Sequence, residues 1–486
     1  MINLLEFFVF IGYTYFPMKK IARSFLVPLI LVSLIAACAP GTPSPSATNL
    51  PVTFTPSAVP SRAASTATSF PEITTDPSSL KGLQIQFMHP WSGDTASEMA
   101  GMVDEFNQSN SWGIHVITQE PGSAGQVSAE LASALTTGNQ PAMVAASMDA
   151  LLSENAASDG FVDLNPYLYS NKWGLSATDL TDFDPVFLQQ DALNGMQFGF
   201  PAQRTAVMMF YNRTWAQQLG FSSPPGTFEE FRAQSCAANS AMKKDTDTTN
   251  DGLGGWIVST EGLVTYSWWV NSNVQLVSSN MYTFDTPAAQ KAFEDEHTLL
   301  TSGCAWIPRA QTSYDYFANR QALFYSGYLQ DIVPQLQAFE RQGKTDTWTL
   351  IPFPADQAQK VVVEGPSYAI LKTTPEKQLA AWLFIRWLSA PSQQQRLVQA
   401  SLTLPLSQSV RTTLLSSPAL PQPWKDVVNS VPSLQPAPSD SNWELARTIL
   451  EDATWQLFKT NLSNADIPML LNQMDSTFTD LKDRKP

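Results

Sequence analysis

Residues 83–107, LQIQFMHPWSGDTASEMAGMVDEFN, decide the fold. At the start of this stretch Leu83, Ile85 and Phe87 alternate with polar residues, which predicts a strand with one buried face. The segment TASE, residues 95–98, has the spacing of a capping box and predicts the start of a helix. The apolar residues that follow recur at helical spacing: Met99, Met102, Val103 and Phe106. A strand, a loop and a helix in this order indicate an α/β protein.

The alternation of strands and helices continues after residue 107. Ile114 and Val116 predict a second strand, residues 127–135 a helix, and residues 143–146 a short buried strand. Strands that alternate with helices form a mostly parallel sheet with helices on both faces. Ligands of such sheets bind beyond the carboxyl ends of the strands, so the loop of residues 89–94 is the first candidate binding loop.

The overall composition is that of an acidic globular protein. The 486 residues are enough for two or three domains, and 43% of them are hydrophobic whereas 15% are charged. With 28 Lys and Arg residues against 43 Asp and Glu residues, the formal net charge is −15. Because this charge repels polyanions, binding to nucleic acid is not expected.

Residues 1–37 are interpreted as a lipoprotein signal peptide, with Met18 as the true start of translation. Read from Met18, the sequence MKKIARSFLVPLILVSLIAAC has a basic start, an apolar segment and two alanines before Cys38. Lipid on Cys38 would anchor an exported protein to the outer face of the cell membrane or in the periplasm. The alternatives are an ordinary signal peptide or a short membrane anchor, although the apolar segment is shorter than the about 20 residues of a membrane span.

The segment that follows Cys38 has a composition of its own. Residues 38–80 are rich in Pro, Ser, Thr and Ala and contain almost no charge. Such a sequence cannot bury a core. It therefore predicts an extended tether between the membrane and a folded part that starts at residue 81.

The two remaining cysteines predict a covalent cross-link. In an oxidising exported compartment, Cys236 and Cys304 most simply form one disulfide, with two free buried thiols as the alternative. There is no CxxC motif and there are three histidines, so neither a zinc site nor another cofactor is expected.

An Asp-rich segment between residues 245 and 252 resembles a calcium-binding loop. Its candidate ligands are Asp245, Asp247 and Asp251. The segment lacks glycine at the sixth loop position, and Trp256 stands at the twelfth position, where such loops have glutamate. A solvated loop of Asx turns is the preferred interpretation.

Eight segments, the first of which lies within residues 83–107, resemble a known family by their order and spacing. They are FMHPWSGDTASEMAGMVDEFN (87–107), ALTTGNQPAMVAAS (134–147), FVDLNPYL (161–168), FGFPAQRTAVMMFYNRTWAQQLGFSSPPGTFEEF (198–231), FANRQALFYSGYL (317–329), IPFP (351–354), EGPSYAILK (364–372) and KQLAAWLFIRWLSAPSQQQ (377–395). Together they resemble the family 1 extracellular solute-binding proteins of ABC importers, which include maltose-binding and glycerol-3-phosphate-binding proteins. The resemblance spans nearly all of residues 83–482, and Ala142 stands where the family often has aspartate.

The resemblance implies a two-lobed α/β fold of the class II periplasmic-binding-protein type, with a hinge and an interlobe cleft. One lobe would consist of residues 81–203 and about 366–403, and the other of about 207–363 and 407–486. The chain would cross between the lobes near residues 203–206, 365–367 and 403–406. Ligand would bind between the lobes, and the lobes would close over it by a hinge motion.

The resemblance also implies a set of ligand-binding residues. They are Trp91, Ser92, Asp94, Asp149, Arg204, Tyr266, Trp268, Tyr328, Trp443 and Arg447. Tyr266 and Trp268 are expected in a loop of the second lobe, and Trp443 and Arg447 lie one helical turn apart on one face of a helix. Aromatic rings stack on the C–H face of a sugar, and charged side chains bind its hydroxyl groups.

Some of these residues also have a structural interpretation that the sequence leaves open. Any of the tryptophans can be a core residue, Arg447 can form an ion pair within the protein, and Asp149 can be a helix cap.

The implied function is capture of a small polar solute, most simply a sugar, by a monomeric protein that delivers it to an ABC transporter permease. Glycerol-3-phosphate or a related anion is the alternative ligand, with Arg204 and Arg447 as phosphate partners. A secreted carbohydrate-active enzyme is a rival class, but the motifs GxSxG, HExxH and GxxxxGK[ST] are absent and no carboxylate pair is recognisable, so an enzyme is not expected. Service to a membrane sensor instead of a transporter stays open.

Overall fold

Two large sheets organise the part of the chain that the computed structural model describes, which is residues 70–278, 281–310, 312–459 and 461–482. The first sheet has the strand order β2-β1-β3-β15-β6. Its strands are β1 (Gln84–Met88), β2 (His115–Gln119), β3 (Met143–Ala146), β6 (Phe200–Pro201) and β15 (Ser367–Ile370). Strands β1, β2 and β3 are parallel, and β15 pairs antiparallel with both β3 and β6. The signal peptide, Cys38 and most of the tether lie outside the described residues.

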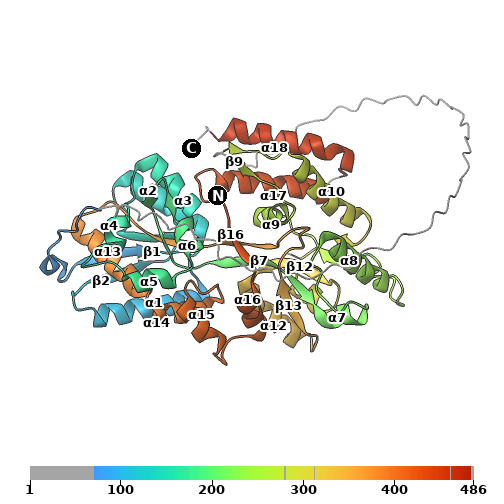
Figure 1. The fold of residues 1–486 in the computed structure, drawn as a ribbon, viewed down its shortest axis with the longest axis horizontal. Helices are drawn as coiled ribbons and strands as arrows, with labels where there is room; N and C mark the ends of the chain where they lie inside the picture. The colour runs from blue at the N-terminus through green and yellow to red at the C-terminus, as the bar shows by residue number, and fades with distance from the viewer. Residues whose placement is uncertain (1–69, 279–280, 311, 460, 483–486) are drawn as a thin grey trace, which may run out of the picture. The chain divides into compact units, whose positions relative to one another are not determined.

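Helices cover both faces of the first sheet, as the alternating pattern predicts (Figure 1). One face packs against α1 (Gly93–Ser109), α13 (Pro375–Leu388) and α14 (Pro391–Ser401), and the other against α2 (Ala124–Thr137) and α3 (Met148–Ser158). The predicted apolar face of α1 is confirmed, since Met99, Met102, Val103 and Phe106 are buried. The capping box is wrong because the helix already begins at Gly93, with Ser92 as its N-cap residue.

The second sheet has the strand order β11-β8-β12-β7-β14-β16, and β13 also pairs with β7. Its strands are β7 (Thr205–Asn212), β8 (Trp256–Ile257), β11 (Ala305–Trp306), β12 (Phe324–Tyr328), β13 (Trp348–Ile351), β14 (Lys360–Glu364) and β16 (Ser433–Pro436). Strands β8, β11 and β12 are parallel, so their carboxyl ends meet at one edge of the sheet. The longest strand, β7, is buried along all eight residues, because it lies in the middle of the sheet.

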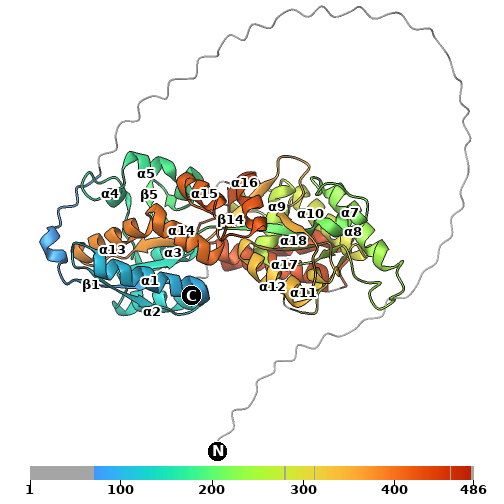
Figure 2. The ribbon, with the colours of Figure 1, turned by 90° about the horizontal axis from the view of Figure 1, so that it is seen from below.

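Four helices stack against one another beside the second sheet (Figure 2). They are α9 (Gly262–Asn271), α10 (Pro287–Thr301), α17 (Trp443–Lys459) and α18 (Ile467–Leu481). The other elements are η1 (Pro77–Leu80), α4 (Asn165–Leu168), α5 (Ala177–Asp182), α6 (Pro185–Gln190), β4 (Ala192–Leu193), β5 (Met196–Gln197), α7 (Arg213–Gln218), α8 (Phe228–Met242), β9 (Val277–Ser278), β10 (Met281–Tyr282), α11 (Tyr314–Ala318), η2 (Leu329–Asp331), α12 (Ile332–Arg341), α15 (Gln408–Leu415), α16 (Gln422–Ser430) and η3 (Asn464–Asp466).

The chain passes between the two sheets at two adjacent segments. It leaves the first sheet after Pro201 and enters the second at Thr205, and it returns between Glu364 and Ser367. These two crossing segments touch: a Cβ atom added to Gly365 would lie 2.3 Å from the backbone oxygen of Gln203. Only glycine permits this approach of two backbones.

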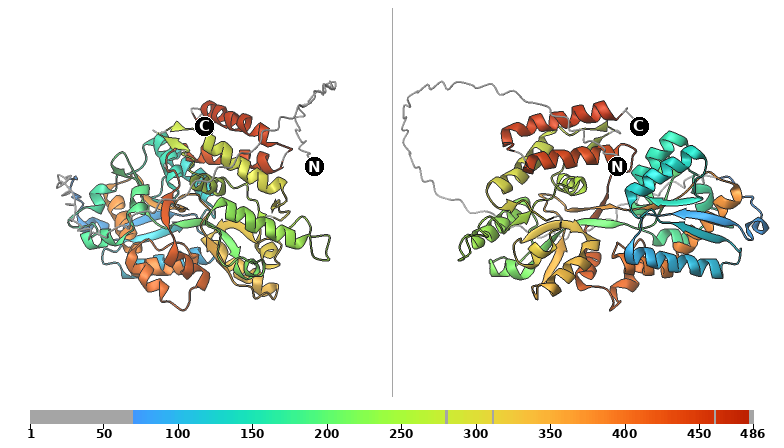
Figure 3. Two further views of the ribbon diagram at one scale, coloured as in Figure 1. Left: turned by 45° about the vertical axis from the view of Figure 1, so that its right-hand side comes forward. Right: turned by 180° about the vertical axis from the view of Figure 1, so that it is seen from behind.

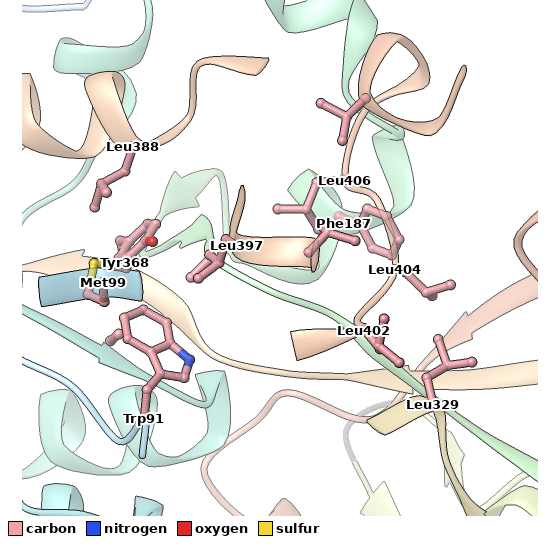
Figure 4. Close-up of a cluster of buried hydrophobic side chains, with 14 of the residues drawn as sticks. Trp91, Met99, Phe187, Leu329, Tyr368, Leu388, Leu397, Leu402, Leu404 and Leu406 are labelled. Atoms are coloured by element: carbon pink, nitrogen blue, oxygen red, sulfur yellow. The ribbon is translucent and has the colours of Figure 1, made fainter. Parts of the chain in front are cut away.

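A third crossing segment, residues 402–406, joins the two lobes through buried leucines. Leu404 pairs with Arg204 in an isolated bridge. Figure 4 shows Leu402 and Leu404 between Phe187 of the first lobe and Leu329 of the second, with Leu406 beside Phe187. A single cluster of buried side chains therefore extends from the first lobe into the second.

The two lobes also approach each other at a pair of helices. Helix α3 of the first lobe contacts α17 of the second, and the view from behind shows the two side by side (Figure 3). The fold therefore consists of two α/β lobes that are linked by crossing strands and that face each other at the first turns of α3 and α17.

The disulfide agrees with the sequence prediction, whereas the end of the predicted tether does not. The disulfide between Cys236 of α8 and Cys304 is confirmed, and its two cysteines are 68 residues apart in the sequence. The predicted tether is too long at its end, because η1 starts at Pro77 and the side chain of Leu80 is buried against the first lobe. An apolar residue beyond the Pro- and Ser-rich segment is thus part of the core.

Candidate functional site

A cavity of about 510 Å³ lies at the carboxyl ends of β8, β11 and β12. Its wall combines aromatic and charged residues: Glu261, Arg309, Tyr314, Tyr325, Tyr328 and Asp331. We call it the tyrosine cavity. This is the edge at which ligands of parallel sheets bind.

Hydrogen bonds fix the polar groups of the tyrosine cavity. The Tyr328 hydroxyl donates to Glu261 at 2.9 Å, and the Tyr314 hydroxyl donates to Asp331 at 2.6 Å. The backbone N–H of Tyr328 donates to the second oxygen of Asp331 at 2.7 Å. Burial raises the pKa of both carboxyl groups, and these hydrogen bonds oppose the rise. The Tyr325 hydroxyl is buried and has no hydrogen-bond partner among the described residues.

Arg447 extends this polar surface along α17. Its guanidinium lies 3.7 Å from a carboxylate oxygen of Glu364, and its side chain is 37% exposed. Burial raises the pKa of Glu364 to about 7, an effect that Arg447 opposes and that the charge of Asp149 reinforces. Gly262, at the start of α9, lets that helix approach α17, since a Cβ atom there would lie 2.3 Å from the backbone oxygen of Arg447.

A second cavity, of about 570 Å³, has walls from both lobes. We call it the hinge cavity. Trp91, Ser92 and Asp94 contribute the loop after β1, and Gln330 contributes the second lobe. Gln203, of the first crossing segment, forms another part of the wall. Ser92 and Asp94 are exposed, whereas Trp91 is buried except for an edge and packs against Phe87 and Tyr368.

Asp149 lies in the first turn of α3, on the side of the first lobe that approaches α17. Its side chain is buried, and its charge acts on Glu364 of the second lobe. The helix-cap interpretation is wrong, because the N-cap residue of α3 is Ser147. Asp149 thus brings a carboxylate of the first lobe close to the Arg447 region.

Arg204 does not reach either cavity wall. Its side chain is completely buried, and its guanidinium donates to Asp191 at 2.6 Å and to the Ser367 hydroxyl at 3.0 Å. Its other donors are used by the side chain of Gln190 and by three backbone carbonyls of the crossing segments, those of Gln203, Gly365 and Pro366. The predicted phosphate contact is therefore replaced by a structural role at the hinge.

Three of the predicted aromatic residues are parts of the second-lobe core. Tyr266 and Trp268 lie on helix α9, not in a loop as predicted. Trp268 packs among Phe231, Trp256 and Phe353. The ring of Trp443 is 1% exposed and meets the ring of Tyr266 at 5.0 Å. These contacts favour core packing for Trp268 and Trp443, whereas Tyr328 lies in the wall of the tyrosine cavity.

The sequence prediction missed Glu261, Glu364 and Gln203. Glu364 and Gln203 stand inside two of the quoted motifs, and each precedes a residue of a crossing segment. Their position next to a predicted hinge was the available signal. Glu261 precedes the glycine that starts α9, and no sequence pattern marks it.

The Asp-rich loop shows the Asx turns that were preferred for it. Asp245 accepts hydrogen bonds from Asp247 and Asn250, and Asp247 accepts two from Thr249. Within residues 70–482, as far as they are described, no group of three His, Cys, Asp or Glu side chains could hold a metal ion. None of the helices in that part of the chain combines the length and apolar character that crossing a bilayer requires.

A family model of bacterial extracellular solute-binding proteins matches residues 101–426. A protein of Brucella abortus that is named as a binding protein is 25% identical over 123 residues, and this match spans 29% of the length of that relative.

Solved structures of sugar-binding proteins share the fold. The sugar-binding protein MalE from Xanthomonas citri has a TM-score of 0.68 and 20% identity over 82% of this chain and 98% of its own. The cyclic α-maltosyl-1,6-maltose binding protein from Arthrobacter globiformis has a TM-score of 0.67 and 17% identity over 82% and 99%. UgpB from Mycobacterium tuberculosis, solved with glycerophosphocholine, has a TM-score of 0.65 and 15% identity over 82% and 99%. The fold is therefore the two-lobed periplasmic-binding-protein fold of class II, with its hinge and interlobe cleft.

Proposed function

The chain belongs to the bacterial extracellular solute-binding proteins, and from this membership we propose that it captures a sugar or short oligosaccharide in the interlobe cleft and delivers it to an ABC transporter permease. Lipid on Cys38 anchors the exported protein to the outer face of the membrane. The protein acts by binding and releasing its solute without changing it.

One observation carries the choice of a sugar. The tyrosine cavity presents Tyr314 and Tyr328 next to the carboxylates of Asp331 and Glu261, with each hydroxyl bonded to a carboxylate. Tyrosine rings offer an apolar face to the C–H groups of a pyranose. Carboxylates accept hydrogen bonds from its OH groups, and hydroxyls both donate to these groups and accept from them. This mixture suits a neutral, polyhydroxylated ligand.

Contacts from both lobes explain why binding closes the cleft. Asp149 and the loop of Ser92 and Asp94 belong to the first lobe, whereas Tyr328 and Arg447 belong to the second. A ligand that touches both sides binds the closed state more tightly than the open state. Only this difference in affinity shifts the equilibrium between the two states.

The charges in the cleft argue against a phosphate ligand. Arg204 uses its donors within the hinge, so Arg447 is left as the predicted phosphate partner. Around Arg447 stand Glu364 and Glu261, and the charge of Asp149 also acts there. Bringing a dianion next to several carboxylates is unfavourable in a partly buried site.

Calorimetric titration of the purified, full mature chain in detergent tests the proposal. The solutes are maltose, maltotriose, glycerol-3-phosphate and glycerophosphocholine. We expect binding of a sugar, a smaller radius of gyration on binding, and a loss of about 1–3 kcal/mol of binding free energy in Tyr328→Ala, because the ring leaves the cavity wall.

The control is Tyr169→Ala, which removes a tyrosine that is 53% exposed and far along the chain from both cavities. This variant should bind like the wild type. Tight binding of a phosphate compound in the absence of sugar binding would overturn the choice of ligand. Product analysis after incubation with the oligosaccharide should return it intact, and cleavage products would overturn the binding role.

A further inference from the structure

We propose that Gln203 is a ligand-binding residue of the hinge cavity, which donates a hydrogen bond from its side-chain amide to an oxygen acceptor of the solute. The inference rests on the proposed function, because it needs a solute in the cleft. It adds a contact on the first crossing segment next to Arg204, whose predicted contact with the solute is replaced by a structural role.

Gln203 is held firmly at the place where the chain crosses between the lobes. Its backbone N–H donates to the carbonyl of Pro366 at 3.2 Å, and its own carbonyl accepts from Arg204 at 2.8 Å. Gly365 of the second crossing segment lies close to the backbone oxygen of Gln203. The residue is 5% exposed and contributes to the wall of the hinge cavity. Its side chain is therefore positioned by the hinge itself.

The orientation of the Gln203 amide follows from its neighbour Trp91. The indole Nε1–H of Trp91 points to Oε1 of Gln203 at 2.5 Å. An indole nitrogen can only donate, so the amide must present its oxygen to Trp91. The amide nitrogen, with its two N–H groups, is thereby turned away from Trp91.

The amide nitrogen of Gln203 is buried and has no partner in the described part of the chain. A buried donor without an acceptor is unfavourable, and most such groups in proteins are satisfied. A hydroxyl or ring oxygen of a sugar in the hinge cavity would supply the missing acceptor. In the ligand-free protein the amide N–H groups of Gln203 are thus available as donors. A solute that accepts a hydrogen bond from them binds more tightly.

Gln330 lines the same cavity and offers a contrast. Its Oε1 also accepts a hydrogen bond from the protein, from the Thr205 hydroxyl. Unlike Gln203, it is exposed, so water can serve its amide nitrogen. The two glutamines therefore share a cavity and a bonding pattern but differ in whether the amide nitrogen reaches solvent. They form a matched pair for an experiment.

The test exchanges each amide for a carboxylate at pH 8. Gln203→Glu keeps an oxygen for the Trp91 N–H but presents a second oxygen where the amide nitrogen was. We expect it to weaken binding by about 10- to 100-fold, because a carboxylate cannot donate the proposed hydrogen bond. Gln330→Glu should weaken binding by about threefold or less, because its amide is already hydrated. Calorimetry with maltose, maltotriose, glycerol-3-phosphate and glycerophosphocholine provides the affinities.

Two further measurements separate binding from folding. Melting temperatures of both variants show that each is folded, and Gln203→Met serves as an uncharged replacement that should also lose affinity by about fivefold or more. Sugar binding in the wild type with equal losses in Gln203→Glu and Gln330→Glu would overturn the role of Gln203 and leave the proposed function standing. A wild type that binds none of the four solutes would overturn the proposed function, and this inference with it.

Discussion

Arg204 and Arg447 were both predicted to face the solute, and the structure gives them opposite environments. Arg204 lies at the hinge with its side chain completely buried and bonded to Asp191, Ser367 and the backbone of both crossing segments. Arg447 lies on the second-lobe side of the cleft, 37% exposed, with one long ion pair to Glu364 at 3.7 Å. The two residues therefore differ in how many of their donors the protein itself uses, although they are of the same type.

The contacts of Arg204 indicate how it stabilises the hinge. The guanidinium of Arg204 donates hydrogen bonds to three backbone carbonyls of the crossing segments, those of Gln203, Gly365 and Pro366. Its charge is balanced by Asp191, whose side chain is equally buried. A buried pair of this kind fixes geometry, because each partner is unfavourable without the other.

Replacing each arginine should show how differently the two residues contribute to stability. Arg204→Met removes the ion-pair partner of Asp191 and takes one hydrogen bond away from each of three backbone carbonyls. We expect the free energy of unfolding to fall by about 3–5 kcal/mol. Arg447→Met should change it by about 0.5 kcal/mol or less, because an exposed ion pair contributes little. Thermal and urea unfolding measure both values.

The double variant Arg204→Met/Asp191→Leu is the control for this prediction. It removes both charges, so it should recover part of the lost stability even though the three carbonyls do not regain their hydrogen bonds to the guanidinium. Equal stabilities of Arg204→Met and Arg447→Met would contradict a structural role for Arg204. In that case its contacts at the hinge would contribute nothing that the chain cannot replace.

The sequence predicted the fold well because periodicity reports which faces are buried. The alternation at Leu83–Phe87 and the apolar face of α1 both follow from burial on one side of a strand or helix, and the disulfide follows from two cysteines in an exported protein. Such patterns need no knowledge of distant partners.

The candidate site was harder to predict, because spacing cannot tell a cavity wall from a core. Trp443 and Arg447 lie one turn apart as predicted, yet the ring of Trp443 is buried against Tyr266 while the side chain of Arg447 is 37% exposed beside Glu364. Glu261 meets Tyr328 only through the fold, since the two residues are 67 positions apart. Contacts of this kind depend on tertiary packing, which a single sequence does not encode as a local pattern.

Arg447 should also contribute to the affinity for the solute. Arg447→Met removes a charged donor from the cleft and should reduce the binding free energy of a sugar by about 1.5–3 kcal/mol. A phosphate ligand would lose more, because its hydrogen bond to the guanidinium is charged on both sides. Calorimetric titration measures the loss.

Arg341→Met is the matched control, since Arg341 is also partly exposed and pairs with a carboxylate, Asp315, at 3.0 Å. It should bind like the wild type. If Arg447→Met also kept full affinity, the cleft-facing arginine would have no part in binding, and the contrast between the two arginines would be one of stability alone.

The smallest expected effect concerns Glu364, the carboxylate partner of Arg447. Burial raises its pKa from 4.5 to about 7, so between these values the folded state holds a proton that the unfolded chain has lost. The stabilisation is complete below pH 4.5 and declines as the pH rises to about 7. Because 26% of the side chain is exposed and solvent weakens the effect, we expect the free energy of unfolding to fall by roughly 1–2 kcal/mol over this range.

Glu364→Gln should abolish this part of the pH dependence, because the amide does not titrate. Urea unfolding at intervals between pH 4.5 and 8 measures the difference between variant and wild type, which should favour the variant increasingly towards pH 8. Glu340→Gln, which removes an exposed carboxylate from α12, is the control. Arg447→Met removes the cation that opposes the rise in the pKa of Glu364. The decline in the free energy of unfolding should therefore extend to higher pH. An unchanged profile in Arg447→Met would mean that the ion pair at 3.7 Å is fully screened by water, and Arg447 would then have its whole guanidinium free for the solute.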